Sequence, residues 1–173
     1  MDNIVLIGMP GCGKSTIGVL LAKILGYSFL DTDLIIQHAE GKRLFEIIRD
    51  KGSDYFAETE NSILSQIRAH KTVIATGGSA VYGKEAMENL SSIGCVVYLE
   101  VSPKRISKRI RNFSARGIVM ENGQSINELY KERHPLYKKY AHITVNCNTG
   151  TLRQNTEKII KALSLDETIS ANQ

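Results

Sequence analysis

Long apolar runs and cysteine residues are both scarce in this sequence of 173 residues. No stretch approaches the roughly 20 consecutive apolar residues that a membrane-spanning helix needs, which argues against a membrane protein. The three cysteines are odd in number and widely spaced, so they suit free thiols in a reducing compartment better than disulfides. The four histidines share no metal-ligand spacing, and we therefore expect no structural metal.

Length and charge indicate a single soluble domain. The sequence has 42% hydrophobic and 23% charged residues, as is typical of a globular protein. A strand begins almost at residue 1 and leaves no room for a signal peptide, so we expect a cytoplasmic protein. We also expect the protein to act as a monomer. The net charge is +4, with basic clusters at 104–111 and 131–139. Neither cluster has aromatic interleaving or a recognition motif, so we expect no nucleic-acid partner; a bound nucleotide explains a basic surface around a cleft.

Residues 8–15 carry the most informative pattern, G-x-x-x-x-G-K-[ST], which is typical of a phosphate-binding loop. The apolar run 4–7 precedes the loop as a buried strand, and residues 16–25 follow with helical spacing of their apolar side chains. Strand, loop and helix are the context that this pattern requires. A glycine-rich turn that only caps a helix would not need four fixed residues at fixed spacing, so we predict nucleotide binding.

The residue types of this loop match that chemistry. Glycines let successive N–H groups approach phosphate oxygens at a helix N-terminus without interference from a Cβ atom. The Lys14 ammonium would reach the β- and γ-phosphates, and the Ser15 hydroxyl would take one coordination position on Mg²⁺. Cys12 occupies a free position of the pattern and has no expected catalytic role. The expected nucleotide contacts are Gly11, Cys12, Gly13, Lys14, Ser15 and Thr16.

Strand-like runs alternate with helical segments along the chain. Strand character is found at residues 4–7, 27–30, 72–75, 95–99 and 143–145, and amphipathic helical character at 54–68 and 151–163. This alternation predicts an α/β fold of three α/β/α layers, with a five-stranded parallel sheet and ligands at the carboxyl ends of its strands. We expect one domain over residues 1–165 and a disordered polar tail at 166–173.

Residues 112–124 have the composition of a mobile lid. Glycine, asparagine and serine surround Arg116, and the segment follows a basic helix. A flap that closes over a nucleotide and excludes water would need this composition. An ordinary surface loop would show it as well, so composition alone leaves both interpretations open.

Two further motifs follow predicted strand ends. Asp31 and Asp33 come directly after the second strand, where one carboxylate can face Mg²⁺ and the other a hydroxyl whose proton must leave. Alternatively, Asp33 caps a helix that starts at Leu34, and it could do both. Gly77 and Gly78 end the third strand and would offer bare backbone to a substrate, although a plain turn would also explain them.

In their order and near their spacing, these motifs resemble those of the shikimate kinases over residues 1–163. The ordered set is far more specific than any one motif. Besides the loop, the aspartate pair and the glycine pair, it includes Gly41 with residues 44–48, Phe56, Glu60, residues 97–100 and residues 133–137.

The resemblance implies a fold similar to that of the nucleoside monophosphate kinases. It also implies transfer of the γ-phosphoryl group of ATP to the 3-hydroxyl group of shikimate, with Mg²⁺ and a lid that closes over the nucleotide. In that case Lys14 and Ser15 hold the phosphates and the metal ion, and Asp31 supports the metal ion. Asp33 binds the substrate hydroxyls and accepts the proton.

The remaining implied roles fall on glycines and arginines. Gly77 and Gly78 contact the substrate, and Arg133 pairs with its carboxylate. Arg109 lies against the adenine, and Arg116 is the lid arginine that neutralises the transferring phosphoryl group. Each role agrees with a loose phosphoryl transfer, which needs positioning and positive charge more than covalent chemistry.

The chain departs from the family pattern in its substrate segments. The family reads approximately G-E-x-x-F-R-x-x-E, and Ala57 stands here in place of the arginine. That arginine is one of two expected on the shikimate carboxylate, and a charged hydrogen bond contributes roughly 1.5–3 kcal/mol, so its loss should weaken a carboxylate ligand about tenfold or more. Ser79 replaces the third glycine of the usual Gly-Gly-Gly. Residues 117–119 replace the common Pro-Leu-Leu and make the lid more flexible.

Shikimate is the expected acceptor, and three alternatives are kept. A kinase of a different hydroxylated small molecule would fit the altered substrate segments. A nucleotide-binding regulator without transfer activity is disfavoured, because the predicted catalytic and metal-binding residues are all present. A GTP-dependent switch is disfavoured because the chain contains no Asn-Lys-x-Asp segment that would read guanine.

Overall fold

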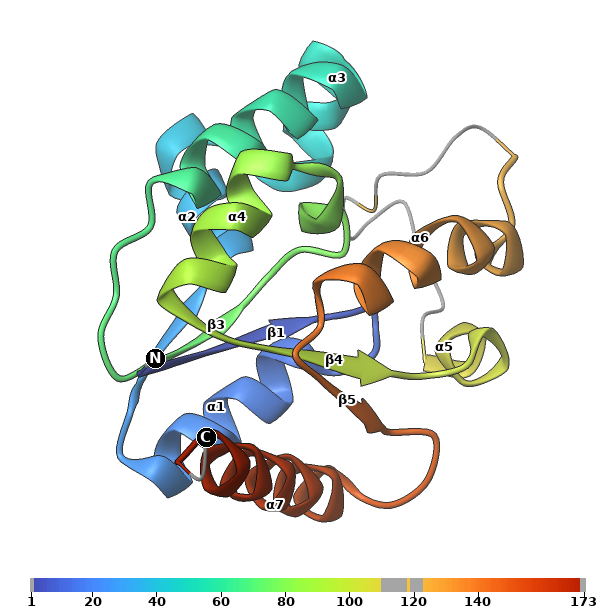
Figure 1. Ribbon diagram of the computed structural model, residues 1–173. Coiled ribbons are helices and arrows are strands. Elements are labelled where there is room, and N and C mark those ends of the chain that lie inside the picture. Colours follow the sequence, from blue (N-terminus) through green and yellow to red (C-terminus); the bar gives the residue numbers. More distant parts are fainter. Residues whose placement is uncertain (1, 110–117, 119–122, 172–173) are drawn as a thin grey trace.

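Five strands form one parallel sheet, as predicted. The computed structural model describes residues 2–109, 118 and 123–171, and their side chains up to residue 164. The strands are β1 (Asn3–Ile7), β2 (Ser28–Asp31), β3 (Thr72–Ala75), β4 (Gly94–Glu100) and β5 (Ile143–Asn146). They lie in the order β2-β3-β1-β4-β5, and every neighbouring pair is parallel (Figure 1).

Helices cover both faces of the sheet and complete the three predicted layers. They are α1 (Lys14–Leu25), α2 (Thr32–Glu40), α3 (Leu44–Ser65), the 3₁₀ helix η1 (Ala80–Tyr82), α4 (Lys84–Ile93), α5 (Pro103–Arg109), α6 (Ile126–Tyr140) and α7 (Leu152–Ala171). Figure 1 shows α1 and α7 together on one face, with α3, α4 and α6 on the other. Helix α7 enters the segment 166–173, whose disorder stays a prediction. No helix within the described ranges is apolar and long enough to cross a membrane.

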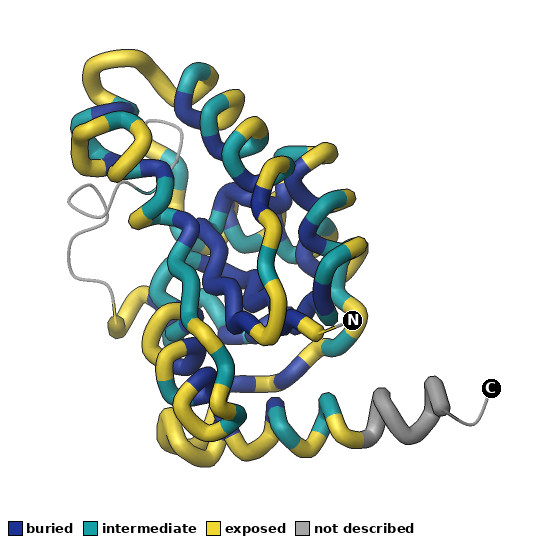
Figure 2. The backbone as a smooth tube through the Cα atoms, turned by 90° about the vertical axis from the view of Figure 1, so that its left-hand side faces the viewer, coloured by how far each residue is buried: buried dark blue, intermediate teal, exposed yellow. Residues whose placement is uncertain are grey.

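The central strands are apolar because helices bury both of their faces. β1 and β3 are buried over their whole length, as parallel strands inside an α/β sheet are (Figure 2). On one face, helix α1 approaches the sheet closely at Gly18. A Cβ atom there would lie 2.6 Å from the Phe29 ring, so the packing of α1 on β2 requires a glycine.

Parallel pairing brings the predicted motifs to one edge of the sheet. Leu6 and Asp31 both pair with Ala75, so the segments that follow β1, β2 and β3 start side by side. These segments are the glycine-rich loop, the aspartate pair and residues 76–79. The carboxyl ends of parallel strands are where α/β proteins bind ligands.

Helix α3 is longer than the sequence predicts and is bent at Gly52. The sequence predicts a helix only over 54–68, whereas α3 begins at Leu44. Gly52 has φ 87° and ψ 167°, which is a non-helical conformation and is open to glycine. The bend separates two helical parts, and it lets Leu44 in the first part and Phe56 in the second both line the same cavity.

Candidate active site

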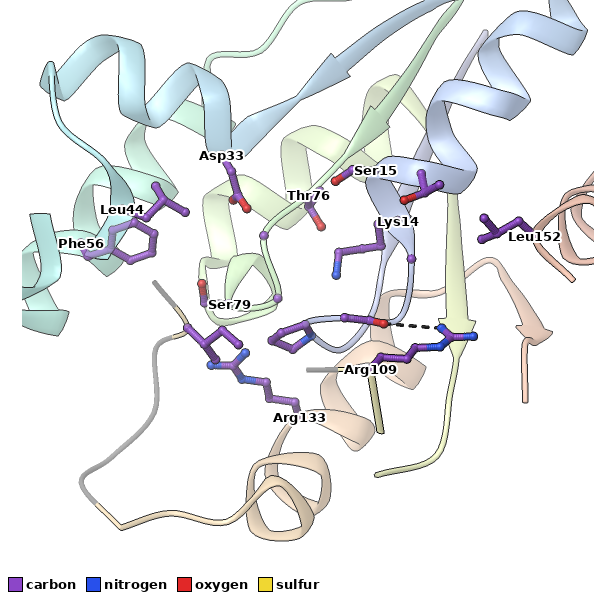
Figure 3. A pocket seen from close by; sticks show the side chains of 17 residues that line it. Lys14, Ser15, Asp33, Leu44, Phe56, Thr76, Ser79, Arg109, Arg133 and Leu152 are labelled. Atoms are coloured by element: carbon purple, nitrogen blue, oxygen red, sulfur yellow. Dashed lines mark hydrogen bonds between the residues drawn. The ribbon is translucent and has the colours of Figure 1, made fainter. Parts of the chain in front are cut away.

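The cavity at the carboxyl edge of the sheet has a volume of about 510 Å³ and gathers most of the predicted site (Figure 3). Its walls come from segments far apart in the chain: the loop after β1, the first turns of α1 and α2, α3, the loop after β3, α5 and α6. The predicted site residues that line it are Gly11, Gly13, Lys14, Ser15, Thr16, Asp33, Gly77, Gly78, Arg109 and Arg133.

Two predicted residues within the described ranges, Cys12 and Asp31, do not line this cavity, and a third lies outside those ranges. Cys12 is buried, and its sulfur atom lies 3.8 Å from the ammonium nitrogen of Lys14. Only the backbone of Cys12 can therefore serve a nucleotide. Asp31 lies next to the cavity at the end of β2. Arg116 and most of the predicted lid fall outside the described residues, so the role of that segment stays a prediction.

The loop after β1 has the geometry that phosphate binding requires. Gly8, Gly11 and Gly13 have φ angles of 142°, 74° and 109°, which residues with a Cβ atom rarely adopt. Gly13 caps α1 without any side-chain hydrogen bond, and the first turn of α1 holds no acidic residue. The N–H groups at this helix end are therefore left for a ligand, and an anion is favoured by the helix dipole.

Lys14 folds back over this loop. Its Nζ donates hydrogen bonds to the carbonyl oxygens of Gly8, at 2.7 Å, and Met9, at 3.0 Å. The side chain is 7% exposed, so its charge lies within the wall of the cavity and not in bulk solvent. Arg109 donates to the carbonyl oxygens of Gly11, at 3.5 Å (Figure 3), and of Cys12, at 3.1 Å. Two cations from α1 and α5 thus flank the predicted phosphate site.

The N-cap of α2 is Asp31 and not Asp33. The suggestion that Asp33 caps a helix starting at Leu34 is wrong, because α2 starts at Thr32 and Asp31 is its N-cap. Asp31 ends β2 with the extended backbone of an N-cap, and its Oδ1 accepts from the Asp33 N–H at 3.0 Å. Asp33 therefore falls in the first helical turn, with its carboxylate in the cavity wall.

Burial and charge together change the acidity of Asp33. The pKa of Asp33 is raised to about 6, mainly by burial; the nearby charge of Asp31 adds to the rise, and the charge of Lys14 opposes it. Its Oδ1 is inaccessible and has no hydrogen-bond partner in the described structure. A carboxylate with a pKa nearer neutrality is a better proton acceptor than an ordinary aspartate.

Arg133 forms the opposite wall of the cavity. It is 1% exposed, its Nε donates to the hydroxyl of Tyr82 at 3.0 Å, and its guanidinium lies 5.1 Å from the centre of the Tyr82 ring. The Gly78 backbone passes beside it: a Cβ atom on Gly78 would lie 2.8 Å from Pro10 and 3.1 Å from Nη1 of Arg133. Tyr137 donates to the Gly78 carbonyl at 2.7 Å. The glycine pair thus brings bare backbone between the loop and a buried cation.

Comparison with known proteins agrees with this geometry. The family model of shikimate kinase matches residues 10–164. A shikimate kinase of Clostridium botulinum (strain Okra / Type B1) is 40% identical over 167 residues, which cover 94% of this chain and 96% of that protein. The chain belongs to the shikimate kinase family. It is therefore a phosphotransferase of the kind that acts on an alcohol group, as the sequence predicts.

Solved structures of shikimate kinases share its fold. The enzyme from Acinetobacter baumannii, in complex with shikimate, is 33% identical and has a TM-score of 0.87, with 96% of this chain and 94% of that chain covered. The enzyme from Aquifex aeolicus is 29% identical, with a TM-score of 0.80 and 95% and 98% covered. These matches confirm the predicted family and the three-layer fold.

Two of the residues that depart from the family pattern, Ala57 and Ser79, fall in the described structure. Ala57, where the family pattern has an arginine, is an exposed residue of α3 and contributes no cation. Ser79, where a third glycine is usual, is buried and lines the cavity. The Ser79 hydroxyl lowers the pKa of Glu60, against the effect of burial.

Glu60 is the main site residue that the sequence leaves without a role. It is 2% exposed, and burial raises its pKa to about 7; the charge of Asp33 adds to the rise, whereas Ser79 and the charges of Arg133 and Lys14 oppose it. The signal was present in the sequence. An acidic residue follows the apolar Phe56 by four positions and precedes Leu64 by four, so it lies on the buried face of α3.

Other residues that the sequence does not predict form apolar parts of the cavity wall or hold a polar side chain in place. Tyr82 holds Arg133, as described above, but a tyrosine after the glycine pair carries no motif of its own. Apolar side chains line the cavity near Asp33 and near Arg109, and periodicity predicts them only as core residues. They are Leu44, Phe56, Ile118 and Leu152.

Proposed function

We propose that this member of the shikimate kinase family transfers the γ-phosphoryl group of ATP to the 3-hydroxyl group of shikimate. The observation that supports it best is the joining of two half-sites in one cavity: a phosphate loop with Lys14 at one end, and Asp33 with Arg133 at the other. The shikimate-bound relative from A. baumannii aligns with 96% of the chain. The acceptor hydroxyl would lie between Asp33 and the phosphate loop.

The nucleotide end of the cavity suits the phosphates of ATP. The uncapped N–H groups of α1 would bind phosphate oxygens, and Lys14 would leave the loop carbonyls for the β- and γ-phosphates. Arg109 would lie against the adenine. Arg116, from the resemblance alone, would close over the transferring group.

We propose that Mg²⁺ binds beside the phosphates of the bound nucleotide. No group of three or more acidic, histidine or cysteine side chains in the described ranges could hold a metal ion by itself. Mg²⁺ suits such a site, because it is usually bound through one or two protein groups together with substrate phosphates and water. We propose the Ser15 hydroxyl and the Asp31 carboxylate as those groups. When bound, Mg²⁺ supplies positive charge to the phosphate oxygens.

At the acceptor end, Asp33 would accept the proton of the reacting hydroxyl. Its pKa of about 6 keeps it ionised at neutral pH while leaving it more basic than an ordinary aspartate. Arg133 would bind the carboxylate of shikimate, and its contact with Tyr82 fixes the direction of the guanidinium. The backbone at Gly77 and Gly78 would contact the acceptor at close range.

We further propose that the chain works in the cytoplasm as a monomer. Its three cysteines are free, which suits a reducing compartment. The large apolar side chains that are exposed are scattered over several elements, as on a typical monomer surface. Size-exclusion chromatography with light scattering would test the monomer, and a mass near 38 kDa, twice the 19.2 kDa of the chain, would contradict it.

The activity is tested by ADP release with MgATP in the presence and absence of shikimate. We expect release to depend on shikimate and on Mg²⁺, with shikimate 3-phosphate detected by mass spectrometry. If ADP release does not increase with shikimate but increases with another hydroxylated acid or polyol, the alternative kinase is favoured. ATP binding with no acceptor-dependent release from any of these compounds would favour the regulator.

A further inference from the structure

The second half of α3 places Ala57 one helical turn before Glu60. Residues three apart are neighbours on a helix surface, so an arginine at position 57 would lie beside Glu60 and could neutralise it. Ala57 has no charge, and its methyl group is exposed. The family pattern has an arginine at position 57, one helical turn from Glu60, but in this chain that position provides no cation.

The surroundings of Glu60 are mixed in charge and almost closed to solvent. Facing it are Asp33 from α2, Arg133 from α6, Lys14 from α1 and the Ser79 hydroxyl from the loop after β3. Its Oε1 has no hydrogen-bond partner in the described structure and is inaccessible. An ionised carboxylate in such a place would keep a large desolvation cost, because its buried Oε1 is not hydrogen-bonded.

Glu60 and Asp33 direct their unpartnered oxygens toward the same point. A Cβ atom on Gly77 would lie 2.5 Å from Oε1 of Glu60 and 2.9 Å from Oδ1 of Asp33. Both oxygens thus reach the backbone of Gly77, and solvent reaches neither of them. Two ionised carboxylates at such close range repel each other, and a proton on one of them removes the repulsion.

We propose that Glu60 remains an uncharged carboxylic acid, so that no cation is needed beside it. In this form it positions Asp33 and admits an anionic acceptor to the cavity. An arginine with an ionised glutamate has no net charge, and neither has an alanine with a neutral glutamic acid. The Ser79 hydroxyl is the polar group of the loop after β3 that acts on the Glu60 carboxyl group. This inference rests on the proposed function, because it takes the acceptor to be the carboxylate shikimate.

We expect the KM for the acceptor, but not the KM for ATP, to depend on pH. The pKa of Glu60 is about 7, so above neutral pH a second negative charge develops behind Gly77. The substrate carboxylate is ionised throughout this range. Its KM should therefore rise with pH, whereas the KM for ATP, which binds on the other side of Lys14, should change little.

The test compares wild type with Glu60→Gln between pH 6 and 8.5, at saturating MgATP. We expect the KM for shikimate to rise about tenfold in wild type, as one added like charge in a closed site allows, and to rise much less in Glu60→Gln, where Asp33, with a pKa of about 6, still titrates at this end of the cavity. Glu58→Gln is the matched control, because Glu58 is an exposed residue of the same helix and should follow wild type. A flat profile in wild type, or the same rise in Glu60→Gln, overturns the inference.

A second measurement does not depend on substrate or on the variant. The side-chain carboxyl carbon of Glu60 can be titrated by NMR in the ligand-free, ¹³C-labelled protein. A midpoint near 7 supports the inference, and a midpoint near the ordinary value of 4.5 overturns it. A midpoint near 7 without shikimate-dependent ADP release would overturn the proposed function while supporting the neutral state of Glu60.

Discussion

Adding the arginine that the family pattern expects should improve shikimate binding. In Ala57→Arg, a charged hydrogen bond to the substrate carboxylate would contribute roughly 1.5–3 kcal/mol. Because residue 57 is exposed on α3, the new side chain loses rotamer freedom when it binds, at a cost of up to about 2 kcal/mol. With a gain of about 2.4 kcal/mol and a cost of about 1 kcal/mol, a net gain near 1.4 kcal/mol remains, and we expect the KM for shikimate to fall about tenfold with kcat nearly unchanged.

Steady-state kinetics with varied shikimate and saturating MgATP measure this change. Ala57→Gln is the control, since it adds a long polar side chain without the charge and should leave KM near the wild-type value. If the natural acceptor has no carboxylate at this place, the arginine would be an unpaired cation beside the cavity. An unchanged or higher KM in Ala57→Arg, with poor wild-type activity, would therefore refute shikimate as the substrate and leave only the kinase class.

Four further changes test single contacts. Lys14→Ala should reduce turnover to less than about a tenth of wild type with an unchanged circular dichroism spectrum, because its charge acts on the transferring phosphates; higher activity contradicts that role. Asp33→Asn should lower kcat far more than ATP affinity, measured by calorimetry, and a collapse of ATP affinity would instead assign Asp33 to the metal site. Gly77→Ala should lower kcat/KM for shikimate at least about tenfold with ATP binding kept, because its Cβ would lie 2.5 Å from Glu60; wild-type kinetics would show that the carboxyl group can move away. Between pH 4.5 and 7 the free energy of unfolding of wild type should fall by roughly 3 kcal/mol relative to that of Glu60→Gln. The reason is that Glu60 keeps a proton in the folded state and releases it in the unfolded state. Urea melts that give the same pH dependence of this free energy for the two proteins would falsify this.

Local sequence patterns predict the strands and the phosphate loop well. Each depends on residues that are adjacent in the chain: an apolar run for a strand, and glycines followed by lysine and serine for the loop. The third strand is found at 72–75, as predicted, and the second is shifted by one residue, to Ser28–Asp31. The strand order β2-β3-β1-β4-β5 is not predicted, because it depends on where each crossover helix packs.

The first half of α3 was missed for a different reason. Its glycine at position 52 interrupts the helical pattern, and only the packed structure shows that two helical parts meet there. The cap of α2 was also misassigned. The sequence offers two aspartates for one cap, and the choice of Asp31 depends on where β2 ends. Both errors concern boundaries that tertiary packing sets.

The two halves of the active site differ in how much they depend on side chains. The nucleotide half uses backbone N–H groups of a glycine-rich loop and the end of a helix, so its residue types follow from conformation and can be predicted from spacing. The acceptor half uses side chains from α2, α3, α6 and the loop after β3, which meet only in the folded protein. A change in one of them, such as the loss of an arginine at position 57, alters the charge that its neighbours experience. For this reason Glu60 gains its proposed role from Ser79 and Ala57 together, and no single position in the sequence would have indicated it.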